Sequence, residues 1–234
     1  MLEEINAVFA EARVAIRKIQ GSGDEQPFTD LILILDNLEK IERIAGKQEG
    51  LESQRELFLE RAAQLTGIQT HVIYTVPLRL VRSADGPQLV DRYGALFVLP
   101  MMKVIERGTK KLFQGGVECL HTLLQKRLGE RLGDLSLKEA FTQEALDFLV
   151  TYSGGHVRSL MTFVQNACAY AEGIPIPLAA AHRAIQQAVR TYSTSIPEGH
   201  WAKLAQLDQS SDQKLPNGDD DYLVMLRNLS VLEY

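Results

Sequence analysis

Hydrophobic positions in the first hundred residues follow two different periods. At residues 2–20 and 51–65 they recur at helical spacing with charge on the opposite face, which predicts two amphipathic helices. Three short apolar runs accompany them, at residues 31–35, 71–76 and 95–99. The first run does not alternate with polar residues, which is typical of a strand buried on both faces of a parallel sheet. Helices and strands in this order predict the α/β fold class, with an open parallel sheet.

The pattern changes after Pro100, beyond which helices dominate. Helical periodicity continues in five segments, at residues 115–131, 137–151, 156–172, 178–194 and about 219–229. Gly, Pro and Asn-Gly signals separate these segments from one another. The chain therefore divides near residues 100–113 into an α/β part and an all-helical part.

Three regions follow from this division. We expect an incomplete α/β domain over residues 1–113, a helical lid over residues 114–195 and a C-terminal helical extension over residues 196–234. Residues 230–234 are strand-like, and a winged-helix domain has such a strand before its wing and return strand. Because no wing follows, we expect an incomplete, winged-helix-like end, in a chain that is a fragment, a split gene product or a truncated open reading frame.

Composition and charge limit the classes of function. The 234 residues are 45% hydrophobic and 24% charged, which is ordinary for a globular protein. A net charge of −5 without a basic patch weighs against a DNA partner. Cys119 and Cys168 lack the spacing of a disulfide framework or a zinc site. No apolar run approaches the roughly 20 residues of a membrane span, and no export signal is recognisable. The sequence therefore predicts a cytoplasmic protein without membrane segments.

The candidate chemistry begins where the first apolar run ends. Residues 31–35 are followed by Asp36, Asn37 and, two places further on, Glu39. A carboxylate at the C-terminal edge of a parallel sheet lies where α/β folds bind ligands. Mg²⁺ keeps most of its waters, so one or two carboxylates suffice to hold it. In P-loop NTPases an Asp at such a strand end holds Mg²⁺ beside the nucleotide phosphates. By that resemblance we predict that Asp36 is a magnesium ligand through water, and that Glu39 or Asn37 orients the water that attacks the phosphate. The alternative is that Asp36 caps the following helix.

Two polar residues elsewhere complete the candidate site. Thr75 lies near the end of the second apolar run, where its hydroxyl could bond a terminal phosphate or the attacking water. Arg158 follows the pair Gly154-Gly155 in the first turn of a predicted helix, and arginine makes forked bonds to phosphate oxygens. The alternatives are a satisfied core threonine and a solvent-facing arginine.

The order of these features resembles AAA+ and related STAND ATPases. In this resemblance residues 31–39 correspond to the Walker B strand, Thr75 to sensor 1 and residues 154–158 to sensor 2. The similarity covers most of residues 28–195. It implies ATP and Mg²⁺ as cofactors and a nucleotide-dependent switch. It also allows Arg107 as an arginine finger toward a neighbouring subunit.

The sequence departs from that family in two places. Many active members have Asp-Glu where this chain has Asp36-Asn37, which puts the catalytic base in doubt. No G-x-x-x-x-G-K-[ST] loop is present; the nearest match, at residues 46–48, lacks the first Gly and the final hydroxyl. We therefore expect weak ATP binding and no hydrolysis by this chain alone. The alternative is a degenerate scaffold that binds a protein partner or itself.

Overall fold

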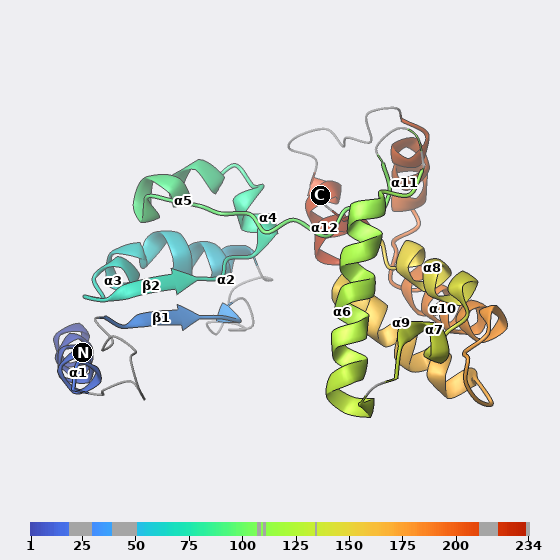
Figure 1. Ribbon diagram of the computed structural model, residues 1–234. Coiled ribbons are helices and arrows are strands. Elements are labelled where there is room, and N and C mark those ends of the chain that lie inside the picture. The colour runs from blue at the N-terminus through green and yellow to red at the C-terminus, as the bar shows by residue number, and fades with distance from the viewer. Residues whose placement is uncertain are drawn as a thin grey trace. The chain divides into compact units, whose positions relative to one another are not determined.

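The chain forms two compact units in the computed structural model (Figure 1). The structure describes residues 1–18, 30–38, 51–106, 109, 111–133, 135–210 and 220–232. Unit 1 spans Met1–Val98 and unit 2 spans Leu99–Tyr234. No helix in the described ranges is long and apolar enough to cross a membrane.

Unit 1 combines short helices with a small parallel sheet. Its elements are α1 (Leu2–Ile16), β1 (Ile32–Leu35), α2 (Leu51–Arg55), η2 (Glu56–Glu60), α3 (Ala62–Thr66), β2 (His71–Tyr74), α4 (Leu78–Val81) and α5 (Gly86–Tyr93). β1 and β2 pair in parallel, with Ile32 opposite His71 and Leu35 opposite Tyr74. The coarse α/β class and the parallel pairing of the first two predicted strands are therefore confirmed.

The core of unit 1 lies between the helices and one face of the sheet. Phe58 of η2, Leu80 of α4 and Leu89 of α5 are buried together, and Tyr74 of β2 packs against them. The Tyr93 hydroxyl at the end of α5 donates to the Phe58 carbonyl over 2.8 Å. Burial is the main cause that raises the pKa of Tyr93 to about 12. This hydrogen bond and the shared core fix α5 against η2.

The opposite face of the sheet corrects the prediction of a strand buried on both sides. Ile32 and Ile34 of β1 are 61% and 64% exposed, and Ile73 of β2 is 53% exposed. Both strands alternate between exposed and partly buried positions because the described helices pack on one face only. The run is apolar at every position, but apolar character alone does not provide a second covering layer.

The third predicted strand is also wrong. Residues 95–99 are described and form no strand. Phe97 and Leu99 are 91% and 95% exposed. The run has the composition of a strand, but strand formation needs a partner edge, and in the described part of the sheet β1 and β2 pair only with each other.

The helix α1 docks at one end of the sheet through polar contacts. The Asn6 side chain donates to the Gly67 carbonyl over 3.0 Å, and its oxygen accepts from the Gln69 N–H over 2.8 Å. Arg13 pairs with Asp30 at 3.2 Å. No side chain of α1 is fully buried. The N-terminal helix is therefore confirmed over Leu2–Ile16, held by polar anchors more than by packing.

The described residues of unit 2 form helices and isolated bridges but no strand. Its helices are α6 (Gln114–Leu132), α7 (Leu137–Ala140), α8 (Gln143–Tyr152), α9 (Val157–Tyr170), α10 (Leu178–Ser193), α11 (His200–Gln209) and α12 (Asp220–Arg227). Four of the five predicted helices are confirmed as single helices. The one predicted at residues 137–151 is divided into α7 and α8, and α11 was not predicted. Residues 230–232, the described part of the strand-like tail, form no strand.

The division between α7 and α8 has a local cause. Ser136 caps α7 in a capping box with Glu139, and Thr142 starts α8 by accepting from the Ala145 N–H. Between the two helices, the Thr142 N–H donates to the Ile176 carbonyl over 3.0 Å. Two consecutive caps and this bridge turn the chain where periodicity suggests one continuous helix.

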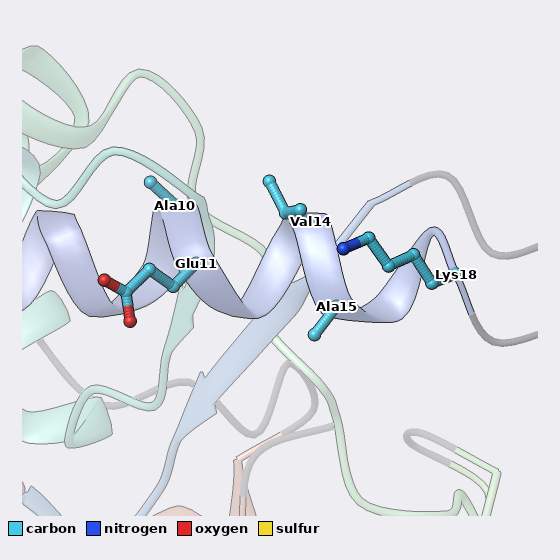
Figure 2. Close-up of a pocket in the computed structure, with 5 residues that line it drawn as sticks. All are labelled: Ala10, Glu11, Val14, Ala15 and Lys18. Carbon is cyan, nitrogen blue, oxygen red and sulfur yellow. The ribbon is translucent and has the colours of Figure 1, made fainter.

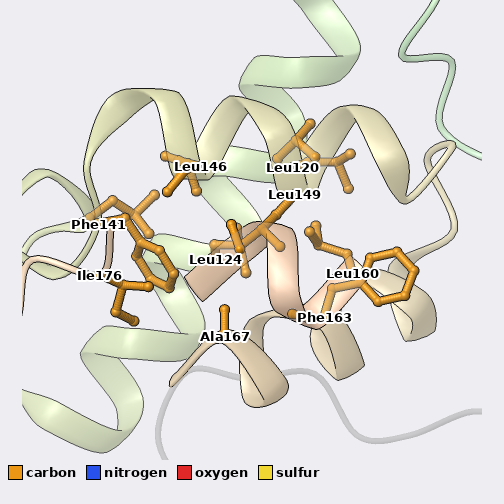
Figure 3. Packing of buried hydrophobic residues seen from close by; sticks show 14 of the residues in the cluster. Leu120, Leu124, Phe141, Leu146, Leu149, Leu160, Phe163, Ala167 and Ile176 are labelled. Carbon is orange, nitrogen blue, oxygen red and sulfur yellow. The ribbon is translucent and has the colours of Figure 1, made fainter. Parts of the chain in front are cut away.

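A continuous apolar core joins the helices α6 to α10 of unit 2. α10 packs against both α8 and α9. The side chains between the helices include Leu120, Leu124, Phe141, Leu146, Leu149, Leu160, Phe163, Ala167 and Ile176 (Figure 3). Burial of this many aliphatic and aromatic side chains supplies the main driving force for folding the helical unit.

Candidate functional site at the ends of the parallel strands

The parallel register brings two of the predicted site residues into contact. Asp36 follows β1 and Thr75 follows β2, so both lie at the C-terminal edge of the sheet. The Thr75 hydroxyl donates to Asp36 Oδ1 over 2.7 Å, and the Thr75 N–H donates to the Leu35 carbonyl over 3.1 Å. Asp36 is exposed and Thr75 is half-buried. The ladder between the strands therefore positions a carboxylate and a hydroxyl side by side, facing solvent.

Asn37 fixes the same carboxylate from its other side. Its N–H donates to Asp36 Oδ1 over 2.8 Å, and its side-chain amide donates to Asp36 Oδ2 over 3.1 Å. Asn37 has a φ of 62°, in the left-handed region that asparagine tolerates better than most residues. A tight turn after β1 thus makes Asn37 a neighbour that orients Asp36.

Two further predicted residues lie outside the described residues. These are Glu39, the alternative water-orienting residue, and Arg107, the candidate arginine finger. The alternative that Asp36 caps a following helix depends on the same stretch after Leu38. These three hypotheses remain predictions.

The metal-binding capacity of the described site consists of one carboxylate. Among the residues described, no group of three or more His, Cys, Asp or Glu side chains could enclose a metal ion. Such a site suits a hard cation whose other ligands are waters or phosphate oxygens, since Mg²⁺ needs only one or two protein carboxylates. It does not suit a structural zinc site, which takes four protein ligands.

The Gly154-Gly155 turn in unit 2 has a structural explanation. Both glycines adopt positive φ, at 57° and 79°. A Cβ on Gly155 would lie 1.6 Å from the Met102 carbonyl oxygen, so only glycine fits there. The Ser153 hydroxyl donates to the Val150 carbonyl over 2.7 Å and accepts from the Gly155 N–H. The glycines thus serve the junction between α8 and α9.

Arg158 stands in the first turn of α9 with its side chain exposed. The neighbouring His156 caps the helix, and its Nδ1 lies 2.7 Å from the Ser159 hydroxyl. Burial, together with the charge of Arg158, lowers the pKa of His156. Arg158 belongs to unit 2 and Asp36 to unit 1, so the structure describes each within its own unit.

An open hollow lies along α1 and is lined by Ala10, Glu11, Val14, Ala15 and Lys18 (Figure 2). Its lining residues come from one exposed face of α1 and from Lys18 just beyond the helix, and Asp36 and Thr75 are not among them.

One polar cluster escaped sequence reasoning. His200 of α11 is 7% exposed, and its Nε2 lies 3.3 Å from Asp221 Oδ1 in α12. Lys203 Nζ approaches Asp221 Oδ2 at 2.6 Å, and its hydrogen bond is the main cause that lowers the pKa of Asp221. The pairing joins residues about 20 positions apart, and no local spacing signals it. The cluster ties α12 to α11.

Comparison with known proteins assigns no family to the chain. No family model matches it, and neither a curated protein nor a solved structure is significantly similar. The functional argument therefore rests on the residues themselves, above all on the contact between Asp36 and Thr75.

Proposed function

We propose that the chain provides the magnesium-binding and phosphate-sensing part of an ATP site, as the rear portion of an AAA+/STAND-type ATPase. The observation that supports the proposal is the 2.7 Å hydrogen bond from the Thr75 hydroxyl to Asp36 Oδ1 at the ends of adjacent parallel strands. Both residues can then reach the same phosphate group. The phosphate-cradling loop comes from a different polypeptide segment, because this sequence contains no such loop.

In this function Asp36 holds Mg²⁺ through a bound water and Thr75 responds to the terminal phosphate. A hydroxyl can donate only one hydrogen bond, so Thr75 exchanges Asp36 for a phosphate oxygen when ATP is present. Loss of the bond from Thr75 leaves the Asp36 carboxylate to the metal and its waters. Asn37, which donates to both carboxylate oxygens, keeps the carboxylate in place during this exchange.

Arg158 connects the helical unit to the nucleotide in the same proposal. Its guanidinium is exposed at the N-terminal turn of α9, beyond a glycine turn whose backbone is fixed by packing. A rigid base and a long cationic side chain suit an arginine that responds to the nucleotide state. The proposed role is thus that of a nucleotide-dependent switch without hydrolysis by this chain.

Binding by the chain alone is weak in this proposal. Most of the affinity for a triphosphate comes from backbone N–H groups and a lysine in the missing loop. A single carboxylate with bound metal leaves a dissociation constant of about 1 mM or weaker. Micromolar affinity or turnover by the chain alone would contradict this account.

Nuclear magnetic resonance with Mn²⁺-ATP tests the proposal at this affinity. Paramagnetic broadening should appear first at the amides of Asp36, Asn37 and Thr75. Asp36→Asn keeps the shape but removes the charge, and should abolish the broadening. The matched control is Asp30→Asn, which changes a carboxylate at the opposite end of β1. Equal broadening in Asp36→Asn and the native chain would refute the metal site.

A second candidate function is a scaffold without nucleotide. It is favoured by the apolar face of Ile32, Ile34 and Ile73, which is more than half exposed at each position. Joining the chain to a segment with a phosphate-binding loop distinguishes the two functions. If ATP turnover appears and Asp36→Ala removes it, the ATPase proposal holds; if Asp36→Ala changes nothing, the scaffold is favoured.

A further inference from the structure

The small sheet of unit 1 has an open edge and an open face. Within the described residues β2 forms backbone hydrogen bonds to β1 only, so its other edge has no partner. The outward face presents Ile32, Ile34 and Ile73, each more than half exposed. An unpaired strand edge beside an apolar face is a template for another strand.

Residues 95–99 have the properties of the strand that this edge lacks. The sequence Ala-Leu-Phe-Val-Leu is uncharged and rich in strand-forming side chains. Phe97 and Leu99 are almost fully exposed, and no backbone group of residues 95–99 has a hydrogen-bond partner in the described part. The segment follows α5 as an extended stretch with neither helix nor strand (Figure 1).

The connection inside one chain does not bring this segment to the edge. α4 and α5 join β2 to residues 95–99, and both are fixed in the core by Leu80 and Leu89. With these helices packed, the chain leaves α5 through Gly94 and remains unpaired. Two complementary elements of the same chain are thus both open while the linking helices are already in place.

We propose that the occupant of the β2 edge is residues 95–99 of a second copy of this chain. The exchange is reciprocal, so each copy donates its segment and receives the other's, which closes a two-fold dimer. Side chains alternate along a strand, so Phe97 and Leu99 point to one face. On the face of Ile73 they extend the apolar surface of the sheet across the dimer. This inference does not depend on the proposed ATP site.

Oligomeric state is the first test. Sedimentation equilibrium of the full chain should show a concentration-dependent dimer. The double variant Phe97→Asp with Leu99→Asp should weaken it by at least about 10-fold, because it replaces the apolar cross-strand contacts beside Ile73 with charges. Val189→Asp serves as the control, since Val189 is an exposed apolar residue of α10 in unit 2. A chain that stays monomeric at all concentrations overturns the proposal.

Cross-linking locates the contact. Cys119 and Cys168 are first replaced by Ser, because both are exposed. Chains with Ile73→Cys are then mixed with chains carrying Phe97→Cys and oxidised. A disulfide between the two different chains supports the exchange. A further sample carries both substitutions in one chain. A disulfide that forms only there, within that chain, overturns the exchange. A dimer in which the two cysteines do not cross-link also overturns it.

Discussion

The two units differ in how completely they bury their hydrophobic side chains. In unit 2, α8, α9 and α10 enclose Leu149 and Leu160, which are fully buried. Unit 1 gathers a smaller core around Phe58 and leaves Ile32 and Ile34 largely exposed on its sheet. Parallel sheets are normally covered on both faces. The helical unit thus buries its own apolar side chains, whereas the α/β unit leaves one face of its sheet exposed.

The largest expected effect separates the stabilities of the two units. Phe58→Ala should destabilise unit 1 by about 4 kcal/mol, because it empties the centre of a small core. Far-UV circular dichroism during urea unfolding should lose the part of the signal that unit 1 contributes. Trp201, the single tryptophan, lies in unit 2. The unfolding transition followed by its fluorescence should therefore keep its midpoint.

The reciprocal variant provides the control. Leu149→Ala should lower the free energy of unfolding of unit 2, followed by Trp201 fluorescence, by about 3 kcal/mol, since Leu149 is fully buried in the core of unit 2. If Phe58→Ala shifts the Trp201 midpoint as strongly as Leu149→Ala does, the two units unfold together and the comparison fails.

A smaller but sharper effect is expected at Gly155. An alanine there would face the Met102 carbonyl oxygen at 1.6 Å and adopt a φ of 79°, so the turn must shift. We expect a loss of roughly 2–4 kcal/mol in the Trp201 transition. Gly129→Ala is the matched control: it lies inside α6 with open space around it and should stabilise unit 2 by about 0.5–1 kcal/mol. Similar effects of the two variants would contradict the packing account.

At the strand ends we expect a loss of about 1 kcal/mol in the stability of the strand pairing. Thr75→Val keeps the side-chain shape but removes the hydrogen bond to Asp36, and a single bond of this kind contributes about 1 kcal/mol. Thr75→Ser retains the hydroxyl and should remain close to the native stability. Hydrogen exchange of the β2 amides measures the difference. Equal protection in both variants would show that the hydroxyl does not hold the strand ends together.

The sequence predicts the elements better than their surroundings. Periodicity locates α6, α9 and α10 because each helix has one side buried in the core of unit 2, and that side leaves a repeat in the sequence. It also locates α1, although no side chain of that helix is fully buried. It also indicates the pairing of β1 with β2. It does not show which faces are covered: every residue of 31–35 is apolar, yet Ile32 and Ile34 are exposed. Covering depends on a neighbouring layer, which no local pattern encodes.

The site shows the same limit. The order of an apolar run and a carboxylate predicts that Asp36 lies at the sheet edge, and a second run places Thr75 near the same edge. Their hydrogen bond depends on the register of β1 against β2, which is set by tertiary packing. The left-handed backbone at Asn37 depends on the local conformation, and the pairing of His200 with Asp221 depends on the packing of α11 against α12. Neither has a signal in the local sequence.

The smallest expected effect concerns Arg158, which is exposed on the well-packed unit. Burial, and then the charge of Arg158, lowers the pKa of His156 below its ordinary 6.5. The unfolded chain therefore binds this proton more readily, so His156 stabilises unit 2 above about pH 6.5 and that stability is lost as the pH falls. Arg158→Gln should raise the pKa of His156 and lessen the loss between about pH 8 and pH 5.

Titration of the His156 ring by nuclear magnetic resonance measures this change directly. Lys126→Gln is the control, because the Lys126 charge does not contribute to the shift of His156. An unchanged His156 pKa in Arg158→Gln would mean that the guanidinium points away from the start of α9. A raised pKa, with the core of unit 2 intact, would instead place the charge at the helix end, where the proposed switch requires it. Arg158→Gln thus tests whether unit 2 presents an exposed cation at the start of α9.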